Sequence, residues 1–331
     1  SLNLQDLKKR LGKIIIGVNF DKKPVTAKDL KANGSMTVLL KDALKPNLVQ
    51  TIEGSPAFIH GGPFANIAHG CNSLMATKTA LKLTDYVVTE AGFGADLGAE
   101  KFFDIKCRLG NLKPNAVVLV STVRALKHHG QGDLKNGISN LGKQIENIKL
   151  FGVPLVVAIN RFDQDRTQEI DFIKSYCQEK GIKAVPSEVW VKGSKGGIDL
   201  AKEVLHLVKK KNNFHFLYQS KWGVKKIVET IVKKVYGGKG IIWERQAERD
   251  LLKYEEWGVK NLPVCVAKTQ ASLSDDPKLL GKPEGFIVKI REVRLSKGAG
   301  FFIPIAGSMM TMPGLPKMPA ANSIDIDRDG K

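Results

Sequence analysis

The stretch that decides the fold reads YVVTEAGFGADLGAEKFFD and covers residues 86–104. Apolar and β-branched residues lead into Glu90, and glycines follow at 92, 94 and 98. This pattern predicts a short strand, a glycine-rich turn and a helix. Backbone N–H groups in such a turn can approach an anion closely, and the helix N-terminus adds a favourable partial charge. The ordinary βα joint of a doubly wound fold has the same pattern, so a phosphate site and a purely structural joint both stay open here.

Length and composition indicate a globular protein with room for two domains. The chain has 331 residues, of which 43% are hydrophobic and 26% charged, as is usual for such proteins. No apolar run approaches the ~18 residues of a membrane span, and the N-terminus reads as a charged helix rather than a signal peptide. The four cysteines show no CxxC spacing. We therefore expect reduced thiols, a cytoplasmic location and no membrane partner.

The formal charge of +19 raises the question of an anionic partner. The lysines are scattered, many on the polar faces of predicted helices, and no DNA- or RNA-binding module is recognisable. We therefore predict no nucleic-acid partner. A positive field would equally suit small anionic substrates, and a solvated basic surface needs no partner at all.

The middle of the chain alternates predicted strands and helices, which is typical of an α/β fold with a mostly parallel sheet. Buried strands are predicted at 116–123, 153–160 and 183–191, and helices at 133–148, 167–180 and 199–210. Flanking elements are a helix over 1–12, a buried strand over 13–19 and a helix from Ala27 capped by Thr26. Near the end we expect helices over 222–236 and 244–257, and strands over 262–268, 285–295 and 300–306 that are partly antiparallel.

Three longer segments carry a family resemblance: SPAFIHGGPFANIAHGCNSLMATKTALKLTDY (55–86), VVLVSTVRALKHHG (117–130) and MTMPGLPKMPAANSIDID (310–327). Together with the opening stretch they closely resemble formate–tetrahydrofolate ligase over essentially the whole chain. The resemblance implies ATP-dependent ligation of formate to tetrahydrofolate through formyl phosphate, giving 10-formyltetrahydrofolate for one-carbon metabolism. It implies Mg²⁺ with the ATP, a monovalent cation as a further candidate, and a homo-oligomer for the full-length form.

The implied fold is a P-loop-NTPase-like, mostly parallel sheet, incomplete at its N-terminal side, with a smaller C-terminal α/β domain. Residues 1–160 would be the remainder of the nucleotide and formyl-phosphate region, and residues 161–331 the folate-binding domain. The chain departs from the family because it contains no G-x-x-x-x-G-K-[ST] motif. We therefore expect a fragment that is inactive by itself. The alternative is a truncated paralogue that binds folate or acts as a scaffold without catalysis, and an unrelated ATPase ranks third.

The resemblance also implies roles for individual residues, which we take as expectations. Glu90, Arg124 and Lys127 would be catalytic, with Glu90 also a magnesium ligand; Gly92, Phe93, Gly94, Asp96 and Asn160 would bind the nucleotide or formyl phosphate; Phe162 and Trp190 would bind folate. Arg124 and Lys127 follow a predicted parallel strand, where open α/β sheets bind ligands, although both can equally sit on a surface helix. From spacing alone, Phe162 and Trp190 can also be core aromatics.

Several other positions bear on these expectations. His60 and His69 lie nine residues apart in a glycine-rich stretch and match no usual metal-ligand spacing, so we expect them to be hydrogen-bonded instead. Ser121, Gln131 and Asp163 depart from the family pattern. Because Gln131 replaces an expected glycine, a left-handed turn there is in doubt. Asp163 replaces an apolar residue or proline, which would leave its loop less rigid.

Overall fold

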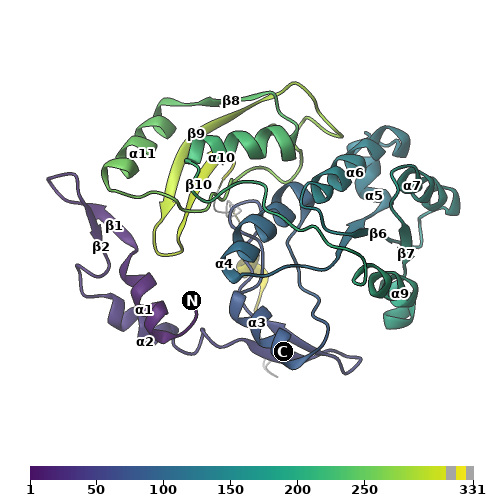
Figure 1. The fold of residues 1–331 in the computed structure, drawn as a ribbon, viewed down its shortest axis with the longest axis horizontal. Coiled ribbons are helices and arrows are strands. Elements are labelled where there is room, and N and C mark those ends of the chain that lie inside the picture. The colour runs from purple at the N-terminus through teal and green to yellow at the C-terminus, as the bar shows by residue number, and fades with distance from the viewer. Residues whose placement is uncertain (311–317, 326–331) are drawn as a thin grey trace.

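The computed structural model describes residues 1–310 and 318–325, and the fold of this part is mixed α/β (Figure 1). A parallel sheet with its helices lies on one side, and a second sheet with helices α10 and α11 lies on the other. Two short hairpins belong to the N-terminal region. The α/β class is thus confirmed. Of the segment 310–327 quoted above, residues 311–317 and 326–327 lie outside the described part of the chain.

The parallel sheet has the order β5–β6–β7. Its strands are β5 (Val117–Ser121), β6 (Leu155–Asn160) and β7 (Ala184–Ser187), and its helices are α5 (Val123–His129), α6 (Leu134–Lys149), α7 (Thr167–Glu179) and α9 (Ile198–Leu207). Every residue of β6 except Asn160 is buried, because the central strand of a parallel sheet is covered on both faces. The predicted helices are confirmed to within a few residues, and so are the positions of the first two strands, but two expectations were wrong. Strand β5 is not buried, because it lies at the end of the sheet, and Val120 is 63% exposed. The strand expected over 183–191 ends at Ser187, because residues 189–192 form a short helix.

The second sheet has the order β10–β9–β8. It consists of β8 (Gly240–Trp243), β9 (Ile287–Ser296) and β10 (Phe301–Ala306), next to α10 (Val224–Ile231), its π-helical continuation Val232–Tyr236, and α11 (Arg245–Glu256). Strand β9 is antiparallel to β10 and parallel to β8, so the partly antiparallel arrangement is confirmed. The predicted strand over 262–268 makes only isolated bridges to β10, at Val264 and Ala267.

The N-terminal region differs from two expectations. It contains α1 (Leu4–Gly12), β1 (Ile15–Val18), β2 (Pro24–Thr26), α2 (Asn33–Leu40), β3 (Asn47–Gln50), β4 (Pro56–Ile59) and α3 (Leu74–Leu83). Strand β1 is largely exposed because it pairs only with β2 in a hairpin. The Thr26 hydroxyl donates to the Asp29 carboxylate at 2.7 Å, which closes a turn. Residues 27–32 form turns, and the helix expected from Ala27 begins only at Asn33.

The predicted strand before the glycine-rich turn was wrong. Residues 86–89 pair with no strand of the described chain, and Val88 is 92% exposed. The glycine-rich turn instead leads into two π-helical segments, Gly94–Ala99 and Phe102–Cys107, which are almost completely buried. Apolar β-branched residues favour a strand only where an adjacent strand and a covering layer exist.

The main hydrophobic core takes residues from both sides of position 160. The rings of Phe103 and Phe151 lie 4.4 Å apart between centroids, and Tyr236 is fully buried in the same core. All four cysteines are buried and unbridged, as expected. The parallel sheet includes strands from before and after residue 160. The division at residue 160 therefore stays a prediction about which part of the chain binds which ligand.

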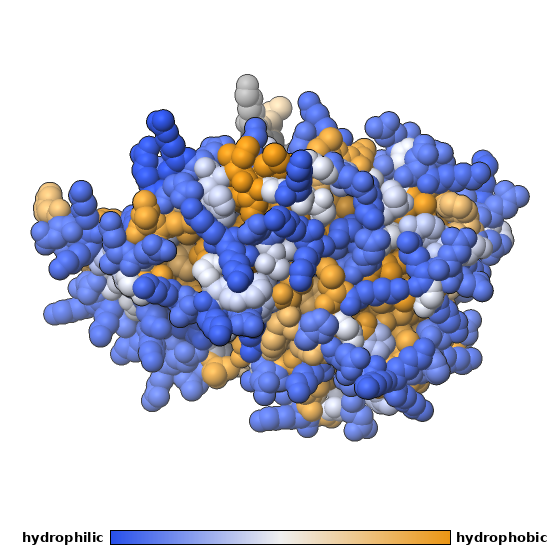
Figure 2. Space-filling model, turned by 45° about the horizontal axis from the view of Figure 1, so that its top comes forward, coloured by the Kyte–Doolittle hydropathy of each residue, from blue (hydrophilic) through white to orange (hydrophobic). Residues whose placement is uncertain are grey.

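The surface is mostly hydrophilic on the face shown in Figure 2, with apolar residues gathered in separate patches. None of the helices in the described ranges is long and apolar enough to cross a membrane.

Candidate active site

The carboxyl edge of the parallel sheet brings several predicted residues together. Strands β5, β6 and β7 are parallel, so the segments after Ser121, Asn160 and Ser187 all emerge at one edge. Arg124 and Lys127 lie on α5, which begins directly after β5, and the Thr122 hydroxyl caps this helix by accepting the Ala125 N–H at 3.0 Å. Open α/β sheets bind their ligands at this edge.

Ion pairs hold the loops of this edge in place. Arg161 lies 3.4 Å from Glu188, which in turn lies 2.5 Å from Lys192, so the segments after β6 and β7 are joined. The hydrogen bond from Lys192 lowers the pKa of Glu188. Lys127 pairs with Glu169 of α7 at 2.5 Å, and this hydrogen bond lowers the pKa of Glu169. Arg124 is exposed and forms no ion pair with a described residue.

The two predicted folate aromatics are surface residues. Phe162 is 37% exposed and Trp190 is 78% exposed, so neither is a core aromatic. Phe162 follows β6 in a turn where its N–H donates to the Asp165 carboxylate and its carbonyl accepts the Asp165 N–H, both at 2.9 Å. Asp163 lies exposed within this closed turn. Trp190 belongs to the short helix α8 (Val189–Lys192) after β7.

The residues from Glu90 to Asp96 form a second group. A Cβ added to Gly92 would lie 2.8 Å from the carbonyl oxygen of Gly70, and one on Gly98 would lie 2.3 Å from that of Ala91. Two glycine-rich segments therefore pack backbone to backbone, which only glycine permits. Both Gly92 and Gly94 have positive φ angles, +77° and +73°, as the expected glycine-rich turn requires. Phe93 is 44% exposed.

The two carboxylates of this group have different environments. Glu90 is exposed, and its side chain makes no hydrogen bond or ion pair with the described residues. The Asp96 side chain is buried; one oxygen accepts from Gln144 at 3.2 Å and the other lies 3.2 Å from the fully buried Lys268 ammonium. The lysine also donates to the carbonyls of Thr269, Ser272 and Ser274.

These environments decide which carboxylate fits a magnesium ion. Mg²⁺ in nucleotide sites takes one or two carboxylates together with water and phosphate oxygens. The free carboxylate of Glu90 meets this requirement, whereas both oxygens of Asp96 already have protein partners. No group of three or more His, Cys, Asp or Glu side chains within residues 1–310 and 318–325 is arranged to hold a metal ion by itself.

No hydrogen bond or ion pair between described residues joins Glu90, Gly92 or Phe93 directly to the carboxyl edge. The connection runs through α6, because Gln144 of this helix accepts the N–H groups of Ala95 and Asp96. Lys101 donates to the Ala65 carbonyl and Lys106 to the Asn72 side chain. These two lysines therefore connect the π-helical segments to the glycine-rich segment 59–72.

The two histidines of segment 59–72, His60 and His69, have different environments. His60 hydrogen-bonds through one ring nitrogen to the Ser73 hydroxyl at 2.7 Å and through the other to the Ala43 carbonyl at 2.8 Å. His69 is packed edge-on against Phe301, and burial lowers its pKa. Hydrogen bonding is therefore confirmed for His60, whereas the Nδ1 atom of His69 has no partner among the described groups.

Gln131 retains the left-handed conformation that a glycine would adopt, with a φ of +55°. The expectation that a non-glycine residue could rule out this turn is therefore wrong. The strain is tolerated because the turn is held by backbone hydrogen bonds, among them Gln131 N–H to the His128 carbonyl at 3.2 Å.

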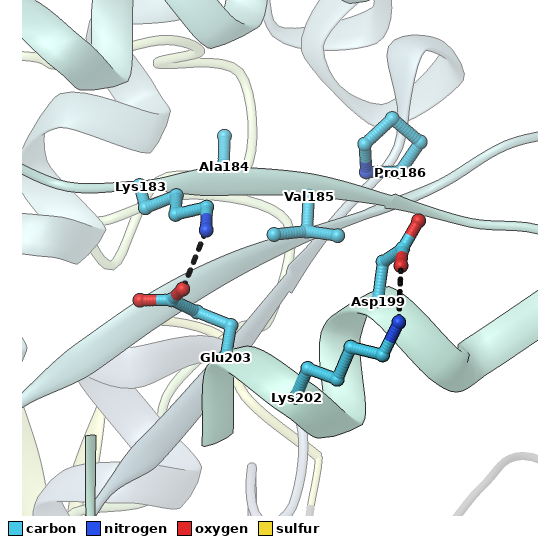
Figure 3. Close-up of a pocket in the computed structure, with 7 residues that line it drawn as sticks. All are labelled: Lys183, Ala184, Val185, Pro186, Asp199, Lys202 and Glu203. Atoms are coloured by element: carbon cyan, nitrogen blue, oxygen red, sulfur yellow. Dashed lines mark hydrogen bonds and ion pairs between the residues drawn. The ribbon is translucent and has the colours of Figure 1, made fainter. Parts of the chain in front are cut away.

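The hollow shown in Figure 3 has a volume of about 380 Å³ and lies between β7 and α9. Its charged groups pair with one another, Lys183 with Glu203 at 2.6 Å and Lys202 with Asp199 at 3.7 Å. None of the predicted site residues lines it. We therefore take the carboxyl edge of the sheet, and not this hollow, as the candidate site.

The sequence model of the formate–tetrahydrofolate ligase family matches residues 1–331. The chain belongs to this family. Membership implies ligation of formate to tetrahydrofolate, and the family's substrates are formate, ATP and tetrahydrofolate. The roles of individual residues in this chain stay predictions.

Sequence reasoning did not assign a role to Glu188 or Lys268. Glu188 lies inside the strand predicted over 183–191, and only the structure shows that β7 ends one residue before it. Lys268 is the last residue of the strand predicted over 262–268, which was an available signal, but nothing in the sequence indicated its ion pair with the distant Asp96.

Proposed function

We propose that this chain carries the tetrahydrofolate-binding part of an ATP-dependent formate–tetrahydrofolate ligase, at the carboxyl edge of a P-loop-NTPase-like sheet. One observation supports this above the others. In a chain of this family, Phe162 and Trp190 are both exposed and both follow strands that end at the same edge. Large exposed aromatics at a ligand-binding edge suit a flat heterocycle such as a pterin.

The remaining residues are assigned according to charge. Arg124 would contact an anionic substrate group, since its guanidinium is exposed. Lys127 would do so only by leaving Glu169, so we expect its contribution to be smaller. Asn160, at the end of β6, would read the nucleotide. Positive groups at this edge would offset the charge that builds up on a transferring phosphoryl group.

Glu90 would hold Mg²⁺ together with phosphate oxygens, and Mg²⁺ would supply charge neutralisation there. Gly92, Phe93 and Gly94 would surround the phosphates or formyl phosphate through backbone N–H groups. We place Asp96 behind this layer, where its pair with Lys268 would position the glycine-rich turn.

Tetrahydrofolate binding tests the proposal directly. Stacking on one ring is worth roughly 0.5–1.5 kcal/mol beyond area burial, so Phe162→Ala should raise the dissociation constant about tenfold. Binding is followed by quenching of tryptophan fluorescence, and because three other tryptophans are present, Trp190→Phe must remove most of the quench. Phe20→Ala is the matched control, since that ring is fully exposed in the β1–β2 hairpin. A quench that survives Trp190→Phe in full would contradict the proposed pocket.

A further inference from the structure

Two buried lysines lie on one face of the π-helical segment that follows the glycine-rich turn. Lys101 is 0% exposed and Lys106 is 4% exposed; the first directly precedes the segment Phe102–Cys107 and the second lies within it. The hydrogen bonds of a π-helix join residues five positions apart, which brings such residues onto the same face, whereas an α-helix would turn them away from each other. Both side chains therefore reach the same neighbouring segment, residues 59–72.

Neutral groups are the only hydrogen-bond acceptors of these two lysines in the described part of the chain. Lys101 donates to the Ala65 carbonyl and Lys106 to the side-chain oxygen of Asn72. The Asn72 oxygen also accepts two hydroxyl groups at 3.0 and 3.3 Å, those of Thr77 and Thr89. Three donors thus share the two lone pairs of one amide oxygen. The Lys106 ammonium also lies 5.3 Å from the centre of the Phe102 ring, a contact that compensates a charge only in part.

The carboxyl groups of this region do not neutralise the two lysines. Neither ammonium forms an ion pair with a described acidic side chain, and Asp96 and Asp104 are paired with other basic residues. Glu100 directly precedes Lys101, but burial raises the pKa of Glu100 well above its ordinary value, which favours the neutral acid. Lysine is rarely buried without an acidic partner, so this pair of charges requires an explanation.

A histidine without a partner lies in the field of both lysines. The Nδ1 atom of His69 is buried and has no hydrogen-bond partner among the described groups. Burial lowers the pKa of His69, and the Lys106 and Lys101 charges lower it further. Burial also lowers the pKa of Lys106. Two ammonium groups and one ring nitrogen are therefore gathered without a negative group, an arrangement that a bound anion would stabilise.

The glycine-rich turn places this cluster next to the surface. A Cβ on Gly92 would lie 2.9 Å from the Cβ atom of Ala65, the residue whose carbonyl accepts the Lys101 ammonium. The next two residues of the turn, Phe93 and Gly94, are exposed. The cluster thus lies directly behind a surface turn, so a small anion needs to pass only this layer to reach it.

We propose that Lys101, Lys106 and His69 bind a small oxyanion, a carboxylate or phosphate group, behind the Gly92–Gly94 turn. The two ammonium groups neutralise its charge, and the His69 ring donates a hydrogen bond when Nδ1 carries the proton. Identifying this anion as formate, or as the phosphate group of formyl phosphate, rests on the proposed function. The affinity of the cluster for an anion does not.

The test titrates sodium formate and, separately, inorganic phosphate into the whole chain by isothermal titration calorimetry, with chloride keeping the ionic strength constant. Lys106→Met keeps the apolar stem, removes the ammonium and leaves Asn72 with its two hydroxyl donors. It should weaken binding of the anion about ten- to a hundredfold, the factor expected for one charge-assisted hydrogen bond. Lys78→Met is the matched control, because Lys78 is exposed on α3, directly after the same segment; it should leave the affinity unchanged.

Urea denaturation without either anion separates binding from folding. Lys106→Met removes a buried charge that has no acidic partner, so the urea midpoint should not fall below that of the unaltered chain. A lower midpoint would mean that the ammonium is already compensated within the protein, and would overturn the proposal.

The titrations themselves can also overturn it. Equal affinities of the unaltered chain and Lys106→Met would do so, as would the absence of saturable binding of either probe to the unaltered chain. Binding of formate alone identifies a carboxylate site, binding of phosphate alone a phosphate site, and competition between the two one site for both. Neither probe contains a pterin, so these outcomes are separate from the tetrahydrofolate titration.

Discussion

Removing the Lys268 ammonium is expected to be among the most destabilising single changes in this chain. The lysine is fully buried, lies 3.2 Å from the Asp96 carboxylate and donates to three backbone carbonyls. Burial lowers its pKa, and the attraction of Asp96 opposes that effect. In Lys268→Met the side chain keeps a similar length and apolar stem, but Asp96 is left as a buried carboxylate with Gln144 as its side-chain partner.

The magnitude follows from the cost of an uncompensated buried charge. Breaking a buried ion pair by removing one partner typically costs about 3–5 kcal/mol, whereas replacing both partners by apolar groups can be nearly neutral. We therefore expect Lys268→Met to lower the free energy of unfolding by about 3–5 kcal/mol. The double variant Lys268→Met/Asp96→Leu should recover at least about 2 kcal/mol of this loss.

Urea denaturation followed by circular dichroism measures these differences, provided that the slope with denaturant stays constant. The matched control is Lys225→Met, which breaks an exposed ion pair with Glu248 at 2.7 Å. Exposed pairs contribute about 0–1 kcal/mol, so the control should lose no more than that. A loss below about 1 kcal/mol for Lys268→Met, or no recovery in the double variant, would refute the reasoning.

Two further changes in stability are expected, one from relief of backbone strain and one from removal of a buried carboxyl group. Gln131→Gly should raise the free energy of unfolding by about 0.5–1 kcal/mol, because glycine relieves the left-handed strain at φ +55° but loses more chain entropy; a urea midpoint that falls would contradict this. Burial raises the pKa of Glu100 well above its ordinary value and that of Asp104 to about 7, so the folded state keeps protons that the unfolded chain releases near pH 4. Their contribution to stability is complete below that pH and is lost as pH rises through the folded pKa, at up to about 1.4 kcal/mol per pH unit for each group. Glu100→Gln should therefore gain stability relative to the unaltered chain between pH 5.5 and 7.5 in urea titrations, and a constant difference between the two would rule the assignment out.

Much of the parallel region was predictable from local pattern. Runs such as VVLVS and LVVAIN, separated by amphipathic helices, identify β5, β6 and the helices around them. For β6 the reason is that a strand buried on both faces must be apolar at every position. The same pattern did not show that Val118 and Val120 of β5 are exposed. The same reasoning placed Asn160, Phe162 and Trp190 at strand ends. The resemblance carried by the long glycine-rich segments added the family, which the comparison confirms.

Other features depended on contacts between residues far apart in sequence. Tyr86 to Thr89 reads as a strand but has no adjacent strand to pair with, and β1 reads as buried but lies in an exposed hairpin. No local pattern indicated that Asp96 pairs with Lys268 or that Glu53 reaches Ser194.

Hydrophobic period and turn chemistry are properties of a few neighbouring residues. The sequence was therefore sufficient for most of the alternating strands and helices and for the sheet edge at which we propose that ligands bind. Burial and charge pairing depend on which distant segments pack together. Only the tertiary structure could therefore show that one acidic residue of the glycine-rich turn, Glu90, is free in solvent while the other, Asp96, is neutralised in the core.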